Sequence, residues 1–278
     1  MAKDRKTVKL YTADVVAATS SKGNQEKWYD ADSNNWHKLD KIGFESLAEA
    51  VASELLAQHS NIESELGYTV VRYHIETVNV HRKDRIASVS PNFLNGEQSI
   101  QTVYHILKRV LGPDYQSVLA DEKNISNRLA LIVDTVEKVS GLTDFGRYIT
   151  LLFEVDALIA NEDRHLNNIA VIEENGVYDY CPLFDNGEGF MLDNVRYPFD
   201  VRTQGMMRNL RAKPFNCQFG RCLTAARNLY GEQLKVSFTD GDIRDIVDKH
   251  LHQYQQFIQP YLKQRIADVV NLQRDKYF

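Results

Sequence analysis

Three polar side chains stand at spacings that suit phosphoryl transfer. Asp163 and Asn168 lie in the polar run 161–168, Asn-Glu-Asp-Arg-His-Leu-Asn-Asn, and Asp185 opens the run Asp-Asn-Gly. Each run follows an apolar segment, which predicts polar loops held at the ends of buried elements. In phosphoryl transfer one carboxylate orients the attacking hydroxyl, while an Asn and a second Asp hold Mg²⁺ against the nucleotide phosphates. The pattern therefore predicts Asp163 as the catalytic carboxylate and Asn168 and Asp185 as metal ligands, with ATP and Mg²⁺ as cofactors.

The residues of these two runs resemble those of the HipA-like serine/threonine kinases, including the small bacterial CtkA type. The resemblance implies an autophosphorylating kinase that transfers the γ-phosphoryl group of ATP to Ser or Thr hydroxyls of a protein substrate. Phosphoinositide kinases share a related Asp-Arg-His-x-x-Asn and Asp-x-Gly pair, so a lipid or small-molecule kinase is one alternative. A nucleotide-binding pseudokinase scaffold is another. The chain departs from eukaryotic kinases, because it has no G-x-G-x-x-G and Asn follows Asp185.

A second motif, Ser20-x-x-Gly23-x-Gln25-x-Lys27, resembles the phosphate loop of the same family. In that family the Ser is an autophosphorylation site that displaces the loop and shuts the enzyme off. The resemblance makes Ser20 the autophosphorylation candidate, with Ser21 beside it. From the residues alone, a plain hairpin loop is the better explanation of a single Gly, although such a loop can also bind phosphates. The predicted nucleotide-binding residues are Ser20, Ser21, Lys22, Gly23, Asn24, Gln25 and Lys38.

A lysine and a glutamate complete the predicted site. A Lys in a strand behind the phosphate loop can reach the phosphates, and Lys38, in the strand-like run 36–40, fits, with Lys41 as the fallback. Apolar residues at helical spacing predict a helix over residues 44–58. In a kinase such a helix supplies the Glu that pairs with the strand Lys, and Glu49 is the predicted partner. Glu45 and, further along the helix, Glu54 are the alternatives.

Within the catalytic loop, His165 could act as a general base because its pKa is ordinarily near neutrality. We assign it a structural role instead, and we expect Arg164 to stabilise the loop through an ion pair. The segment 189–214 is rich in Arg and is either a docking site for a peptide or anionic substrate, or a surface loop with scattered charges.

The order of elements predicts an α+β fold with two lobes, like that of protein kinases. Strand-like runs at residues 7–16, 68–73 and 77–80 precede a turn-rich hinge near residues 90–96. Helical spacing then dominates. Helices are expected from residue 99 to about 111, over about 125–140 and 143–160, over 223–229, from Asp240 as an N-cap, and over the tail from 254 to about 274. We therefore predict an N-lobe over residues 1–95 and a helical C-lobe over residues 96–278, with ATP and Mg²⁺ between them.

Composition excludes some classes of protein. The 278 residues carry a net charge of −5, so general nucleic-acid binding is not expected. There is no run of eighteen apolar residues and no signal-peptide core, which predicts a cytoplasmic protein without a membrane span; a leaderless secreted effector has the same pattern. Three cysteines lack metal-type spacing and suit a reducing compartment. The HipA N-terminal subdomain is expected to be missing, which leaves an antitoxin-like partner as an unsupported alternative.

Overall fold

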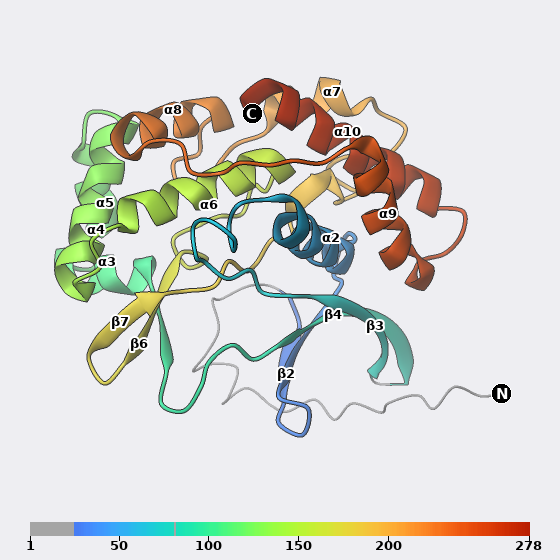
Figure 1. The fold of residues 1–278 in the computed structure, drawn as a ribbon, viewed down its shortest axis with the longest axis horizontal. Helices are drawn as coiled ribbons and strands as arrows, with labels where there is room; N and C mark the ends of the chain where they lie inside the picture. Colours follow the sequence, from blue (N-terminus) through green and yellow to red (C-terminus); the bar gives the residue numbers. More distant parts are fainter. Residues whose placement is uncertain (1–24, 81) are drawn as a thin grey trace.

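The computed structural model describes residues 25–80 and 82–278. Within them an antiparallel sheet is formed in the order β1-β2-β4-β3. Figure 1 labels β2, β4 and β3 of this sheet. Its strands are β1 (Lys27–Asp30), β2 (Asn35–Leu39), β3 (His74–Val80) and β4 (Lys83–Pro91). The register sets Lys38 of β2 opposite Lys27 on one side and Ser88 on the other. This sheet presents the predicted phosphate-binding lysine.

Helix α2 (Glu45–His59) lies between this sheet and the helical body (Figure 1). Ten of its fifteen residues are buried, because the helix packs on β3 and β4 on one side and on helix α9 (Asp240–His250) on another. Glu54 forms ion pairs with Lys249 at 2.7 Å and with His250 at 2.7 Å, both on α9. Helix α2 is therefore fixed by the helical body as well as by its own sheet.

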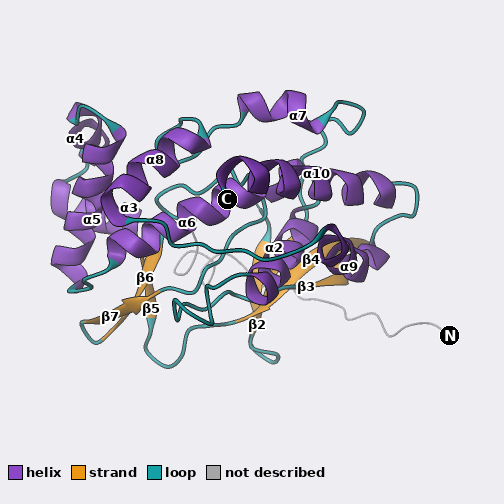
Figure 2. Ribbon diagram, turned by 45° about the horizontal axis from the view of Figure 1, so that its top comes forward, coloured by secondary structure: helices purple, strands orange, loops and turns teal. Residues whose placement is uncertain are grey.

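The helical body makes up most of the chain after residue 98 (Figure 2). It opens with a second antiparallel sheet in the order β5-β6-β7, and the segment that carries Asp163 and Asn168 leads directly into β6. The strands are β5 (Ser99–Thr102), β6 (Ala170–Glu174) and β7 (Val177–Tyr180). The helices are α3 (Val103–Leu111), α4 (Tyr115–Asp121), α5 (Ile125–Ser140), α6 (Phe145–Ile159), α7 (Thr203–Met206), α8 (Phe219–Tyr230), α9 (Asp240–His250) and α10 (Gln259–Tyr277), with one-turn 3₁₀ helices η1 (Gly189–Met191), η2 (Met207–Asn209) and η3 (Leu251–Gln253).

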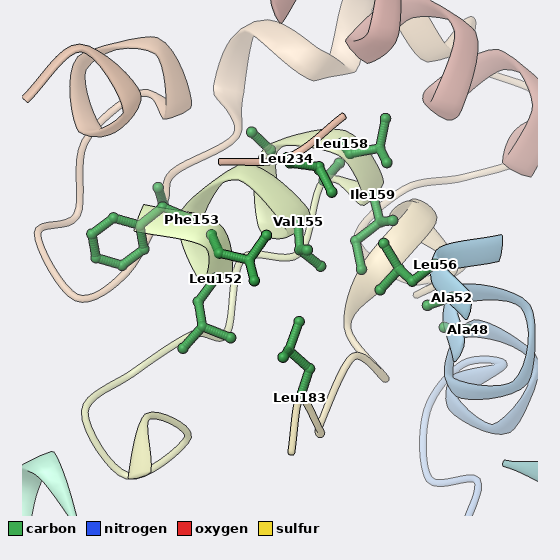
Figure 3. Packing of buried hydrophobic residues seen from close by; sticks show 14 of the residues in the cluster. Ala48, Ala52, Leu56, Leu152, Phe153, Val155, Leu158, Ile159, Leu183 and Leu234 are labelled. Carbon is green, nitrogen blue, oxygen red and sulfur yellow. The ribbon is translucent and has the colours of Figure 1, made fainter. Parts of the chain in front are cut away.

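Helix α6 is the centre of the hydrophobic core, and all but one of its residues are buried. Figure 3 shows Leu152, Val155 and Ile159 of α6 together with Leu56 of α2 and Leu183, which precedes the Asp185 loop. Helix α6 ends at Ile159 because Ala160 adopts a left-handed conformation with a φ of 56°. The predicted catalytic loop thus starts from the end of a helix that is buried in the core.

The structure corrects several predicted elements. The run 68–73 is not a strand and makes only an isolated bridge between Val70 and Leu183. Strand β4 was missed, and the helix predicted from residue 99 is split into β5 and α3. Thr239, rather than Asp240, is the N-cap of α9, where it forms a capping box with Asp242. The predicted strand over residues 7–16 lies outside the described residues.

No helix in the described part of the chain is long and apolar enough to cross a membrane. The three cysteines, all within that part, are buried free thiols. Cys217 and Cys222 therefore form no disulfide here.

We predict that Gly146→Ala destabilises the protein, although Ala is the better helix former. A Cβ at residue 146 would lie 2.4 Å from Cδ1 of Tyr230 and 2.9 Å from its Cγ, so the ring of Tyr230 must move. Overpacking costs about 1–3 kcal/mol, which exceeds the gain in helix propensity of at most about 1 kcal/mol. Urea unfolding should show the loss. Gly205→Ala in α7 is the matched control, since its Cβ would meet no atom within 4 Å; equal stability of the two variants would contradict the prediction.

We also predict that Asp40→Asn stabilises the protein at neutral pH. The Asp40 carboxyl accepts hydrogen bonds from the Ser46 N–H at 2.7 Å and the Tyr254 hydroxyl at 3.1 Å. Burial raises its pKa from 3.8 to about 6 in spite of these bonds. The native state therefore binds the proton more tightly, and the stability this contributes is present below pH 4 and is lost as the pH rises through 6. We expect the variant to gain about 2 kcal/mol at pH 7.5 and little at pH 4. A gain that is the same at both pH values would argue against this explanation.

Candidate active site

Lys38 lies between two carboxylates that come from distant parts of the chain. Its ammonium is 3.1 Å from Oε1 of Glu49 on α2, and it also forms an ion pair with Asp185 in the loop after β7. An ammonium has three donors, so these contacts leave one for a phosphate oxygen. The sheet, helix α2 and the Asp185 loop thus meet at one side chain.

The charges of this cluster are strongly coupled. Burial lowers the pKa of Lys38, but Asp185 and Glu49 outweigh it and hold that pKa well above its usual value. Burial opposes ionisation of Asp185, yet the Lys38 ammonium brings the pKa of Asp185 down to about 2. Burial raises the pKa of Glu49, and Lys38 only partly offsets it. Lys38 therefore stays charged. Asp185 stays ionised, so its carboxylate is able to bind a cation.

The structure separates the three glutamates of α2 that the sequence offered as partners. Glu49 alone of the three contacts Lys38, and its second oxygen accepts from the Asn186 N–H at 2.8 Å. The Glu45 carboxylate accepts hydrogen bonds from backbone N–H groups of residues 41–43, and Glu54 pairs with α9. The backbone of Lys41, the fallback lysine, belongs to that Glu45 turn.

Two lysines face Asp185 from the sheet. Lys27 lies directly opposite Lys38 in the β1–β2 register. Burial lowers the pKa of Lys27, as does the Lys38 charge, while Asp185 raises it. Like charges opposite each other in a sheet are unfavourable, so the pair suits an anionic ligand. Gln25 donates from its side-chain amide to the Leu39 carbonyl at 2.6 Å, which ties the start of β1 to β2. The remaining predicted phosphate-loop residues, Ser20 to Asn24, lie outside the described residues.

The predicted catalytic loop leaves the Asp163 side chain partly exposed. Asn161 accepts from the Asp163 N–H at 3.1 Å, and the Asp163 carbonyl accepts from the His165 N–H at 2.7 Å, which forms a tight polar turn. The Asp163 side chain is 40% exposed. Its Oδ1 is 2.6 Å from Nζ of Lys213, and its Oδ2 is 3.8 Å from Nε2 of His165. The carboxylate is thus accessible to an incoming hydroxyl.

The side-chain oxygen of Asn168 is an unused acceptor among the described residues. Its Nδ2 donates to the Asp163 carbonyl at 3.1 Å, which fixes the orientation of the amide. Its Oδ1 is buried and has no hydrogen-bond partner among the described residues. A buried acceptor without a donor is costly, and a bound cation would remove that cost.

Arg164 joins the catalytic loop to the Asp185 loop. The guanidinium is buried and pairs with Asp156 of α6 at 3.0 Å. It also donates to the carbonyls of Asn168 at 3.3 Å and Phe184 at 2.7 Å, and to Oδ1 of Asn186 at 2.8 Å. Arg164 therefore fixes the backbone of Asn168 and of Phe184, the residue before Asp185. Its ion pair with Asp156 agrees with the role expected for it.

Sequence reasoning missed two acidic residues of the site. Glu162 is buried beside Asp163 and binds the Tyr197 hydroxyl, the Arg196 guanidinium at 2.9 Å and the Arg211 N–H at 2.6 Å. Burial and then the charges of Asp163 and other acids raise the pKa of Glu188 to about 7. The only sequence signal was position: Glu162 adjoins Asp163, and Glu188 lies three residues after Asp185.

The donor set fits Mg²⁺. Within residues 25–80 and 82–278, no three His, Cys, Asp or Glu side chains group into a metal site. Mg²⁺ is usually bound by one or two protein carboxylates together with water and substrate phosphates, rather than by a protein cage. The ionised Asp185 and the unsatisfied oxygen of Asn168 are donors of that kind.

Comparison with known proteins identifies the fold. No protein-family model matches the chain, and no curated protein sequence does. The structure is similar to the proinflammatory kinase CtkA of Helicobacter pylori, with a TM-score of 0.56 and 14% identity over 94% of each chain. It is also similar to HipA of Shewanella oneidensis MR-1, solved with HipB and operator DNA, with a TM-score of 0.46, 11% identity, and coverage of 93% of this chain and 65% of the HipA chain. The chain thus has a CtkA-type, kinase-like fold, with a small antiparallel sheet and a helical body, and the predicted fold class is confirmed.

We predict that Arg164→Met costs about 3–5 kcal/mol at pH 7, because it leaves a buried carboxylate without its partner. Burial already raises the pKa of Asp156 against the effect of Arg164. Without Arg164 that pKa rises further, so the variant should be most stable at low pH and lose stability as the pH rises. Denaturant unfolding at pH 5 and pH 8 measures this. The double variant with Asp156→Asn should recover part of the loss at pH 8; no recovery would show that the other contacts of Arg164 dominate.

Proposed function

We propose that the protein is an ATP- and Mg²⁺-dependent kinase that transfers the γ-phosphoryl group to Ser or Thr hydroxyls of a protein. The observation that carries the proposal is the convergence of Lys38, Glu49 and Asp185 beside the loop of Asp163 and Asn168. These residue types are the ones that phosphoryl transfer requires, and they occur here on a CtkA-type fold.

In the proposed reaction each residue has one task. Lys38, oriented by Glu49, binds the nucleotide phosphates through its remaining donor. Asn168 and Asp185 would hold Mg²⁺, which supplies positive charge against the phosphate oxygens. Asp163 orients the acceptor hydroxyl and accepts its proton, since its carboxylate is the accessible one. The hydroxyl oxygen forms a bond to the γ-phosphorus as the bond to the β-phosphate oxygen breaks, and ADP leaves with that electron pair.

A protein acceptor is favoured by the surroundings of Asp163. The segment from Arg196 to Lys213 reaches Glu162 and Asp163 through ordered contacts, so residues beside the acceptor hydroxyl meet a folded, polar surface. Autophosphorylation at Ser20 or Ser21 remains a prediction that rests on the resemblance of the phosphate loop.

We predict that incubation with ATP and Mg²⁺ adds a phosphoryl group to the wild-type protein but not to Asp163→Ala. Intact-mass spectrometry measures the gain, and peptide mapping should place it at Ser20 or Ser21. Chelation of Mg²⁺ by EDTA should abolish it. ATP should still raise the melting temperature of Asp163→Ala, because Asp163 acts on the acceptor and not on the nucleotide.

Two outcomes would contradict the proposal. Thermal stabilisation by ATP, without transfer to the protein itself or to dephosphorylated casein, would favour a nucleotide-binding scaffold. Transfer to phosphoinositide vesicles and to neither protein would identify a lipid kinase on the same fold.

A further inference from the structure

Lys213 contacts the catalytic carboxylate from a segment that is distant in sequence. Its Nζ lies 2.6 Å from Oδ1 of Asp163, and the two side chains are 47% and 40% exposed. Exposed ion pairs contribute only about 0–1 kcal/mol to stability. The pair therefore has little importance for the fold, and its effect falls on the carboxylate that would receive the hydroxyl.

The backbone around Lys213 is fixed to the catalytic loop. The Arg211 N–H donates to Glu162 at 2.6 Å, and Glu162 is the neighbour of Asp163. Ala212 and Cys217 exchange two backbone hydrogen bonds, of 2.6 and 3.2 Å, which close a short loop that contains Lys213. Lys213 therefore stands at Asp163 because its segment is anchored there, and not only because a long side chain can reach it.

The local charge balance calls for a cation at this point. Asp163 and Asp185 are both close enough to Glu188 to raise its pKa, together with its burial. Lys38 and Lys27 face Asp185, on the nucleotide side of the site. Among the described contacts, the ammonium on the Asp163 side chain is that of Lys213. Positive charge is thus present at both ends of the path that a phosphoryl group would follow from nucleotide to acceptor.

We infer that Lys213 is a further catalytic residue of the proposed kinase, whose ammonium holds Oδ1 of Asp163 and donates to the γ-phosphoryl oxygens during transfer. The inference rests on the proposed function. With Oδ1 bound, Oδ2 is the oxygen that takes the proton of the acceptor hydroxyl. An ammonium has three donors, so two remain for the phosphoryl group after the bond to Asp163. A compact charge on a flexible stem can follow that group as its bond to ADP breaks and its bond to the acceptor forms.

A transition-state analogue tests this inference without the natural acceptor. Isothermal titration calorimetry would compare binding of ADP and Mg²⁺ with and without aluminium fluoride, which mimics the phosphoryl group in transfer. For Lys213→Ala we expect unchanged affinity for ADP. The gain in affinity that aluminium fluoride gives should be at least tenfold smaller than in the wild type. Lys213→Arg, which keeps the charge, should retain part of it. Lys263→Ala removes a similarly exposed ammonium, paired with Asp248 away from the site, and should behave as wild type.

Turnover gives a second readout. With dephosphorylated casein as the acceptor, Lys213→Ala should lower kcat about 100-fold, as the loss of one donor to a developing charge does in other enzymes. The KM for ATP should be unchanged, whereas a merely structural lysine would leave kcat close to that of Lys263→Ala.

The outcomes separate the two ideas. If the wild type gains affinity with aluminium fluoride and Lys213→Ala gains as much, the role of Lys213 is refuted and the proposed function stands. If the wild type binds ADP but aluminium fluoride does not raise its affinity, the inference about Lys213 is also refuted. If the wild type binds no ADP, the proposed function fails, and the inference falls with it.

Discussion

The rest of the site depends on the contacts of the buried Arg164 guanidinium. It binds Asp156 on α6, the carbonyls of Asn168 and Phe184, and the side chain of Asn186, which belong to three separate segments. A planar fork of five donors can satisfy acceptors in several directions, which a lysine ammonium cannot do in the same way. Burying a charge is unfavourable unless it is paired and hydrogen-bonded, and here each acceptor that lowers this cost also fixes one piece of the site. The predicted catalytic loop and the Asp185 loop are therefore held in place together, by the same side chain.

The sheet joins this network through helix α2. Glu49 accepts from the Asn186 backbone with one oxygen and from Lys38 with the other, so the lysine is oriented by a group already tied to the Asp185 loop. The helix has little freedom of its own, because Glu54 pairs with Lys249 on α9 and the apolar residues of α2 belong to the core that surrounds α6 (Figure 3). The ion pair between Lys38 and Glu49 thus follows from packing within one chain. A mechanism that controlled the site by swinging α2 outward would have to break buried apolar contacts and the pairing with α9 together.

The part of the site that could be predicted from sequence is the part encoded by short spacings. Asp163 and Asn168 lie five residues apart in one loop, and Asp185 follows a strand hairpin, so a local pattern brings them together. Lys213 reaches Asp163 across fifty residues, through an irregular segment whose path has no periodicity to read. Short elements were missed for a related reason: β5, Ser99–Thr102, precedes a helix whose apolar spacing continues back into the strand, so the pattern predicted one helix. The fold class was predictable because long amphipathic helices such as α5 carry their buried residues, among them Leu129, Ile132 and Val136, at clear helical spacing.

Burial along the predicted catalytic loop explains how one short segment can both hold the fold together and expose a reactive side chain. Glu162 and Arg164 are 7% and 1% exposed, whereas the side chain of the residue between them, Asp163, is 40% exposed. Two buried charges of opposite sign therefore anchor the loop, while the side chain between them is exposed. Glu162 binds the backbone of the segment that carries Lys213, and Arg164 binds the backbone of the segment that carries Asp185. Substitution of Glu162 or Arg164 should therefore disturb folding and chemistry together, and of these three residues only Asp163 allows the two to be separated.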